Sequence, residues 1–355
     1  MRPCWRAEIE QLNYAIIESV CQIEEQKLMM KTIADIAKLA GVAKSTVSRY
    51  LNGGSVSEAT KLQIERVIQE HNYIPNTFAR SLKAKKAHII GTIVPRLDSF
   101  ATSQMLMVID QELRDAGFQT LISNTSQDMK REIEAIYEFA RQKVAGVILI
   151  AVQITEEHVR AAEETGLPIL LVGQSHPHFA CVIHDDYGAG QVMGEYIISM
   201  GHRRIIYLGV TEQDVAVGKR RKEGFASAIQ SYDCEVSYME TTFSMTDAMN
   251  TAFKLLEEQR PSVIVCATDN IALGVMKAAF LHNIAIPSEL SVTGFGGYDV
   301  TEIIHPTLTT VKYGYKETGR QAAQNIIKLV REELLEPVTT MNFELMKRES
   351  VDNKA

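Results

Sequence analysis

Short apolar runs alternate with amphipathic segments along most of the chain, from Ile89 onwards. Such runs are typical of strands buried on both faces, which occur in parallel sheets covered by helices. The predicted strands are 89–95, 120–124, 146–150, 169–173, 181–185, 204–210, 262–268 and 291–295, and the clearest helices are 104–116, 129–142, 248–259 and 270–282. Because about 260 residues exceed one core of this kind, the pattern predicts two similar α/β lobes.

Polar side chains follow several of the predicted strands. Ligands of parallel sheets bind outside the carboxyl ends of the strands. Hydrogen-bonding residues occur there after the first strand (Arg96, Asp98, Ser99), after the fourth (Gln174) and after strand 262–268 (Asp269). The sequence therefore predicts a cleft that holds a polar ligand.

A run of four cations, residues 219–222, lies where the sequence predicts the start of a helix. Such runs are usually solvated, but the unpaired N–H groups of a helix N-terminus attract anions. Arg221 adds a planar fork that suits a carboxylate or a phosphate. Lys219 and Arg221 are therefore candidate ligand contacts, and Arg96 is expected to face them across the cleft.

Charge is distributed unevenly along the chain. The whole protein carries a formal net charge of −7, yet residues 31–88 hold ten Lys and Arg against four Asp and Glu, a net of +6 that leaves −13 elsewhere. A basic segment attached to an acidic body suggests a head that binds a polyanion. Charge alone is equally consistent with a solvated basic surface.

The basic segment has the pattern of a helix-turn-helix unit. Thr32 and Asp35 form a capping box for a first helix, Gly41-Val42 interrupts it, and a second helix covers 44–51. A third helix begins at Ser57. In this motif the second helix enters the major groove of DNA. The residues expected to contact DNA there are Lys44, Ser45, Thr46, Ser48 and Arg49, with Val47 and Leu51 facing the core.

A proline-containing break at 73–76 separates this unit from a short basic stretch. A large apolar side chain, Leu82, lies at the centre of residues 77–86, and three lysines follow it. An apolar residue within a basic segment suits a wedge that enters the minor groove and opens a base step. A solvated linker is the alternative on spacing alone.

Several other classes of protein are disfavoured. Five scattered cysteines without CxxC spacing argue against a zinc ribbon or a disulfide framework and fit a reducing cytoplasm. No apolar run approaches the roughly 20 residues that span a bilayer. Gly188 to Gly194 approaches the dinucleotide fingerprint, but its third glycine is one place late, so close helix packing is the better interpretation. We expect no cofactor, no metal site and no catalytic residues.

The N-terminal 30 residues have helical spacing but no sign of chemistry. They are treated as an extension of uncertain role, either dispensable or an additional dimerisation helix.

The motifs of the head resemble those of the LacI/GalR family of repressors. The likeness covers residues 31 to about 350 and rests on Thr32 to Val42, Ser45 to Arg49, Leu51-Asn52, Asn72 to Asn76, Ala79 to Leu82, Gly201 to Arg203, Arg221 to Phe225, Ala267 to Gly274 and Leu308 to Val311. Two positions depart from the family pattern. Ala43 stands in place of a capping Ser or Thr, and Phe295-Gly296-Gly297 stands in place of Gly-aromatic-Asp-Asp.

The resemblance implies a fold of three parts: an all-α helix-turn-helix headpiece at 31–75, a hinge helix at 76–87, and a two-lobed α/β core at 88–350 like the periplasmic binding proteins. The first lobe would comprise 88–184 and 313–342, and the second 185–312 and 343–350. The resemblance also adds further DNA contacts at Thr32, Asn52, Tyr73, Asn76 and Ala79, and makes Leu82 the minor-groove wedge.

Within the family, segments 96–99, 217–221 and 314–323 resemble the repressors of sucrose and trehalose operons. The resemblance implies a sugar or sugar-phosphate effector, of the sucrose-6-phosphate or trehalose-6-phosphate type. It would contact Arg96, Asp98, Ser99, Gln174, Lys219, Arg221, Asp269 and Tyr315. The implied partners are pseudo-palindromic operator DNA and a second copy of the chain.

The sequence therefore predicts a cytoplasmic, homodimeric, allosteric repressor of a sugar-utilisation operon, without enzymatic activity or membrane association. Two alternatives remain open. One is a global carbon regulator of the same fold that depends on a protein co-repressor, and the other is a sugar-binding protein without a role on DNA.

Overall fold

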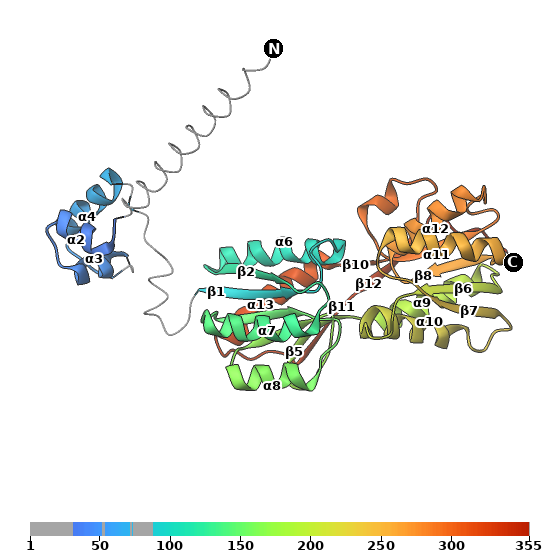
Figure 1. Ribbon diagram of the computed structural model, residues 1–355, viewed down its shortest axis with the longest axis horizontal. Helices are drawn as coiled ribbons and strands as arrows, with labels where there is room; N and C mark the ends of the chain where they lie inside the picture. The colour runs from blue at the N-terminus through green and yellow to red at the C-terminus, as the bar shows by residue number, and fades with distance from the viewer. Residues whose placement is uncertain (1–30, 52–53, 72, 74–87, 355) are drawn as a thin grey trace, which may run out of the picture. The chain divides into compact units, whose positions relative to one another are not determined.

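A computed structural model describes residues 31–51, 54–71, 73 and 88–354, which belong to two separate compact units (Figure 1). The boundary between the units falls between Ala84 and Lys85. Within the described residues no helix is long and apolar enough to cross a membrane. The N-terminal extension and the predicted hinge helix at 76–87 lie outside the described residues.

The first unit contains three described helices, α2 (Ile33–Leu39), α3 (Lys44–Leu51) and α4 (Glu58–Glu70). The predicted capping box is confirmed, because Asp35 N donates to Thr32 Oγ1 at 3.3 Å and Thr32 N donates to Asp35 Oδ2 at 2.8 Å. The three helices share a small core made of Ile36, Ala37, Ala40, Val47, Ile64 and Val67. The helix-turn-helix arrangement predicted from the sequence is therefore present.

The second unit contains two six-stranded sheets, one in each lobe (Figure 1). The first sheet has the order β11-β5-β4-β3-β1-β2 and pairs only parallel strands. Its strands are β1 (Ile89–Val94), β2 (Gln119–Asn124), β3 (Gly146–Ile150), β4 (Ile169–Val172), β5 (Ala180–His184) and β11 (Val338–Met341).

Helices cover both faces of the first sheet. They are α6 (Phe100–Asp115), α7 (Met129–Arg141), α8 (Glu156–Thr165) and α13 (Tyr315–Val330). Alternate strand residues enter two different apolar clusters: Ile148 joins the cluster that contains residues of α6 and α13, whereas Val147 and Leu149 join that of α7 and α8. This alternation explains why the strands appear in the sequence as continuous apolar runs.

The second sheet has the order β12-β10-β9-β8-β6-β7, and its one antiparallel pair is β10 with β12. Its strands are β6 (Arg204–Gly209), β7 (Glu235–Glu240), β8 (Val263–Cys266), β9 (Ser291–Gly296), β10 (Thr309–Tyr313) and β12 (Phe343–Met346). The main helices around it are α9 (Asp186–Ser199), α10 (Arg221–Ile229), α11 (Met245–Glu258) and α12 (Asp269–Leu281). The prediction of two parallel-sheet lobes is confirmed.

Four strands were not predicted, namely β7, β10, β11 and β12. Strands β7, β11 and β12 lie at sheet edges, and their residues are exposed or only half-buried, so they form no continuous apolar run. Strand β10 is buried except at Lys312, whose charge interrupts the run.

The chain passes between the two described lobes three times: between β5 and α9, between β10 and α13, and between β11 and β12 (Figure 1). The residues at these crossovers include His184, Asp186, Tyr313 and Tyr315. They lie at the carboxyl ends of β5 and β10, so the crossovers border the space between the two sheets.

Candidate functional sites

The exposed face of α3 is polar and basic. Lys44, Ser45 and Arg49 are exposed, Thr46 and Ser48 are half-buried, and Val47 is buried in the core of the head. Helix α3 is held against α4 by Tyr50, whose hydroxyl donates to Glu65 Oε1 at 2.8 Å. A rigid helix with hydroxyl and cationic side chains on one face suits contacts with phosphates and base edges.

The other predicted DNA contacts differ in how they are placed. Thr32 is exposed, and its side chain caps α2. Tyr73 is half-buried, and its backbone N donates to Ile68 O at 3.0 Å at the end of α4. Four further candidates lie outside the described residues: Asn52, Asn76, Ala79 and Leu82.

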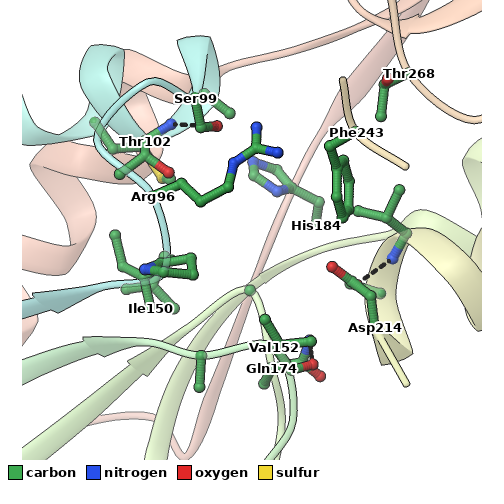
Figure 2. Close-up of a pocket in the computed structure, with 18 of the residues that line it drawn as sticks. Arg96, Ser99, Thr102, Ile150, Val152, Gln174, His184, Asp214, Phe243 and Thr268 are labelled. Atoms are coloured by element: carbon green, nitrogen blue, oxygen red, sulfur yellow. Dashed lines mark hydrogen bonds between the residues drawn. The ribbon is translucent and has the colours of Figure 1, made fainter. Parts of the chain in front are cut away.

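A cavity of about 150 Å³ lies between the lobes of the core (Figure 2). Residues at the carboxyl ends of β1, β3, β4 and β5 line one side, among them Arg96, Val152, Gln174 and His184. The second lobe contributes Asp214, Arg221, Phe243, Thr268 and Tyr298 among others. The cavity thus occupies the position that parallel sheets offer to a ligand.

Five of the predicted effector contacts line this cavity: Arg96, Ser99, Gln174, Arg221 and Tyr315. Arg96 Nε lies 3.3 Å from Asp98 Oδ1, and the Arg96 guanidinium stacks over the ring of Phe243 at 5.0 Å from its centroid. Gln174 Nε2 donates to the carbonyl of Val152 at 2.8 Å. Ser99 Oγ caps α6 by accepting from the backbone N of Thr102.

Arg221 is the centre of a buried charge network. Its Nε donates to Asp186 Oδ1 at 2.6 Å, and its Nη1 donates to the carbonyl of Ala267 at 2.8 Å. The Tyr313 hydroxyl donates to the same Asp186 oxygen at 3.0 Å, and the Tyr313 ring lies under the Arg221 guanidinium. Arg221 therefore reaches the cavity with most of its charge already balanced.

Lys219 does not line the cavity, which corrects the sequence interpretation. Although α10 begins at Arg221, the run 219–222 is not a free helix start, because a π-helical stretch of six residues from Val215, capped by Asp214, precedes α10 directly. Lys219 and Arg220 are exposed, and Arg220 pairs with Glu223 at 2.9 Å. Of the cations predicted to converge with Arg96, Arg221 lines the cavity, whereas Lys219 and Arg220 do not.

Two predicted carboxylates are also placed outside the cavity lining. The Asp98 side chain is 83% exposed and borders an adjoining outer cavity of about 470 Å³. Asp269 is fully buried: its Oδ1 accepts from Thr310 Oγ1 at 2.5 Å and its Oδ2 accepts from Tyr298 N at 2.9 Å. Its neighbours Thr268 and Asn270 line the cavity instead. Asp269 thus connects α12 to β10 rather than facing a ligand.

The cavity residues that sequence reasoning missed include His184, Asp186, Asp214 and Phe243. The rule used for Arg96 and Gln174 would have found His184, which ends β5. The same rule would have found Asp186, which follows β5 by two residues as Arg96 follows β1. Asp214 lies five residues beyond β6, and Phe243 follows β7, which was not predicted.

The comparison with known families decides what kind of protein this is. The family of bacterial regulatory proteins of the lacI type matches residues 32–76. The family of periplasmic binding proteins and sugar-binding domains of LacI proteins matches residues 87–348. The chain belongs to the LacI family.

Individual relatives cover nearly the whole LacI-family chain. The sucrose operon repressor of Staphylococcus xylosus is 37% identical over 308 residues, which cover 86% of this chain and 96% of that protein. The regulator TreR of Escherichia coli K12 is 31% identical over 300 residues, which cover 84% of this chain and 93% of that protein. The lac repressor dimer bound to operator and the anti-inducer ONPF shares the fold, with a TM-score of 0.84 and 23% identity. The match covers 91% of this chain and 99% of that chain.

We expect Arg49→Ala to weaken operator binding more than binding to random DNA. A lost base contact costs about 1–3 kcal/mol of discrimination, whereas a lost phosphate contact weakens both complexes alike. Titrations of the full chain against both DNAs at one salt concentration measure the difference. Equal losses on the two DNAs would make Arg49 a phosphate contact.

We expect Asp214 to contribute stability to the core that is lost as the pH rises from about 4 to 7. Burial raises the pKa of Asp214 to about 6, above its ordinary 3.8. Because the folded pKa is the higher one, the stabilisation is complete below pH 3.8 and is lost as the pH rises through 6. The loss for this one group is on the order of 3 kcal/mol.

Asp214→Asn tests this pH dependence, because an amide keeps the cap on Val217 N but does not titrate. Between pH 4.5 and pH 7 the free energy of unfolding in urea should change more favourably for the variant than for the wild type, because the variant lacks the loss at Asp214. Asp269, whose pKa burial also raises to about 6, adds to this loss. His184 and His202, whose pKa values burial lowers to about 4, gain stability over the same range, so the comparison of variant with wild type is what isolates Asp214. An unchanged slope would show that Asp214 ionises freely in the folded core.

Proposed function

We propose that this LacI-family regulator is a homodimeric, cytoplasmic repressor of a sugar-utilisation operon, released from its operator by a sugar or sugar phosphate. The observation that carries the proposal is the combination of a polar, basic face on α3 with a cavity between two lobes to which Arg96, Ser99 and Gln174 contribute polar side chains. The sucrose operon repressor and TreR support the choice of a sugar operon.

In this proposal, α3 enters the major groove and Lys44, Ser45, Thr46, Ser48 and Arg49 contact phosphates and base edges. The segment 76–87 forms the hinge, with Leu82 as a minor-groove wedge. The effector changes the relation of the lobes and so weakens the binding of the head to DNA. Allosteric coupling of this kind is typically worth about 1–3 kcal/mol.

The phosphate of a sugar phosphate would lie on the Arg96 side of the cavity. Arg96 and Ser99 both line it beside the N-terminus of α6, a helix of 16 residues. Helix N-termini and arginine together favour a phosphate. Arg221 contributes less than expected from the sequence, because Asp186 already balances it. A neutral sugar would instead use the amide of Gln174 and the hydroxyl of Tyr315.

We expect calorimetry to show that sucrose-6-phosphate and trehalose-6-phosphate bind more tightly than sucrose and trehalose. A hydrogen bond to a charged group contributes about 1.5–3 kcal/mol, so Arg96→Ala should reduce this preference at least about tenfold. Arg131→Ala is the matched control, since Arg131 is exposed on α7 near Asp128 and does not line the cavity. Tighter binding of a neutral sugar would contradict the phosphate subsite.

Operator binding tests the repressor role itself. The sugar that binds most tightly should lower the affinity of the full chain for its operator. If none of the four sugars changes operator affinity, the sugar-released mechanism is wrong.

A further inference from the structure

His184 ends β5 at the first crossover between the lobes and lines the cavity (Figure 2). Its ring packs against Tyr313 at 4.8 Å and edge-on against Tyr315 at 5.7 Å, between ring centroids. Both tyrosines belong to the second crossover, between β10 and α13. The imidazole therefore lies where two of the connections between the lobes meet the ligand space.

The hydrogen bonds around Thr318 determine which ring nitrogen of His184 carries the proton. Thr318 Oγ1 lies 2.9 Å from the carbonyl of Gly314 and 2.9 Å from His184 Nε2. A carbonyl only accepts, so the single hydroxyl proton of Thr318 is donated to Gly314. His184 Nε2 must then be the donor to Thr318, which leaves Nδ1 without a proton.

Nδ1 of His184 makes no hydrogen bond to any residue that the structure describes. Burial, with the nearby Arg221 charge adding to it, lowers the pKa of His184 to about 4, although Asp186 opposes the shift. The ring is therefore neutral at neutral pH. A neutral imidazole with a fixed Nε2–H tautomer presents a lone pair, and only a donor can satisfy it.

We propose that His184 is a specificity-determining residue of the cavity, whose Nδ1 accepts a hydrogen bond from a ligand hydroxyl while Thr318 holds the tautomer. This inference rests on the proposed sugar effector and deepens it. A sugar hydroxyl can donate to Nδ1, whereas an ionised phosphate oxygen or a ring oxygen only accepts and is disfavoured there. His184 thus orients a sugar phosphate with a hydroxyl towards the crossovers and its phosphate towards Arg96.

The experiment uses the full chain and four probes: sucrose, trehalose and their 6-phosphates. Calorimetry selects the tightest probe, and its deoxy and deoxyfluoro derivatives at each hydroxyl are then compared. One hydroxyl should matter by about 10- to 100-fold, since its loss leaves Nδ1 covered by the bound ligand without a donor. Fluorine at that position should not restore affinity, because it cannot donate.

Three variants separate recognition from folding. His184→Phe keeps a ring without nitrogens, and we expect it to bind the parent sugar at least about tenfold more weakly and to be indifferent to the critical hydroxyl. Thr318→Val removes the acceptor that holds the tautomer and should weaken binding, whereas Thr318→Ser should behave as the wild type. Nitrogen-15 NMR of labelled histidine should show the Nε2–H tautomer of His184 in the free wild type but a mixture in Thr318→Val.

The outcomes are distinguishable. Binding of a sugar by the wild type with unchanged affinity in His184→Phe overturns the role of His184 and leaves the proposed function intact. An Nδ1–H tautomer in the free wild type also overturns it, without any ligand. Failure of all four sugars to bind contradicts the proposed function and, with it, a sugar contact at His184.

Discussion

Arg221→Met is expected to destabilise the core by about 3–5 kcal/mol, because removal of one partner leaves a buried charge uncompensated. The side chains of Arg221 and Asp186 are only 7% and 6% exposed, and their contact measures 2.6 Å. The variant would also leave the carbonyl of Ala267 without its donor. The midpoint and slope of urea unfolding at pH 7 measure this loss.

The double variant Asp186→Asn/Arg221→Met separates the effect of the unpaired Asp186 charge from that of the lost Arg221 packing. Replacing both members of a buried ion pair removes the uncompensated carboxylate. We therefore expect the double variant to be more stable than Arg221→Met alone. If the losses in stability of Asp186→Asn and Arg221→Met simply add in the double variant, the pair is not coupled. The stability then comes from packing of the Arg221 side chain on Tyr313 and Phe295.

Much of the fold could be predicted because the physical signals are local. The capping box of Thr32 and Asp35, the interruption at Gly41 and the apolar positions of α3 are all encoded within a few residues. The central strands of both sheets are buried on both faces, so each appears as an apolar run. Edge strands such as β7 carry no such signal, since one side of each edge faces solvent.

The site was less predictable, because side-chain direction depends on distant partners. Asp269 follows a strand as expected, yet Thr310 and the backbone of Tyr298 hold its carboxylate away from the cavity. Lys219 was misplaced because the π-helical turn at Val215–Arg220 moves the helix start back to Asp214. Neither the contact between α12 and β10 nor the additional turn is visible in residue spacing.

The glycines of α9 and α10 carry the second large effect. A Cβ on Gly190 would lie 2.2 Å from the carbonyl oxygen of Arg221, and one on Gly224 would lie 2.0 Å from that of Tyr187. Both neighbours are backbone atoms, so neither can move without separating the two helices. This confirms that the Gly188–Gly194 segment serves close helix packing.

We expect Gly190→Ala and Gly224→Ala each to destabilise the core by about 3 kcal/mol or more, at or beyond the upper end of overpacking. The sign of the change in unfolding free energy is informative, because alanine is the better helix former by about 1 kcal/mol and would stabilise an uncrowded helix. Gly314→Ala controls only for the added methyl group, because Gly314 is the N-cap of α13 and not a helix-interior residue: its φ is −81° and its Cβ would find the nearest atoms at 3.7 Å. Urea unfolding of the three variants gives the comparison.

The same substitutions should also lower the affinity of the core for its effector, because Gly190 packs directly on the backbone of Arg221. If α9 and α10 separate, Arg221 moves relative to Asp186, which lies on α9, and the charge network at the cavity is disturbed. Calorimetry under conditions where the variants remain folded should therefore show weaker sugar binding for Gly190→Ala but not for an exposed change such as Arg131→Ala. If Gly190→Ala and Gly224→Ala fold stably and bind the sugar with wild-type affinity, the contact between α9 and α10 relaxes without moving the cavity residues. Ala267 and Tyr313 would then be the residues that position Arg221.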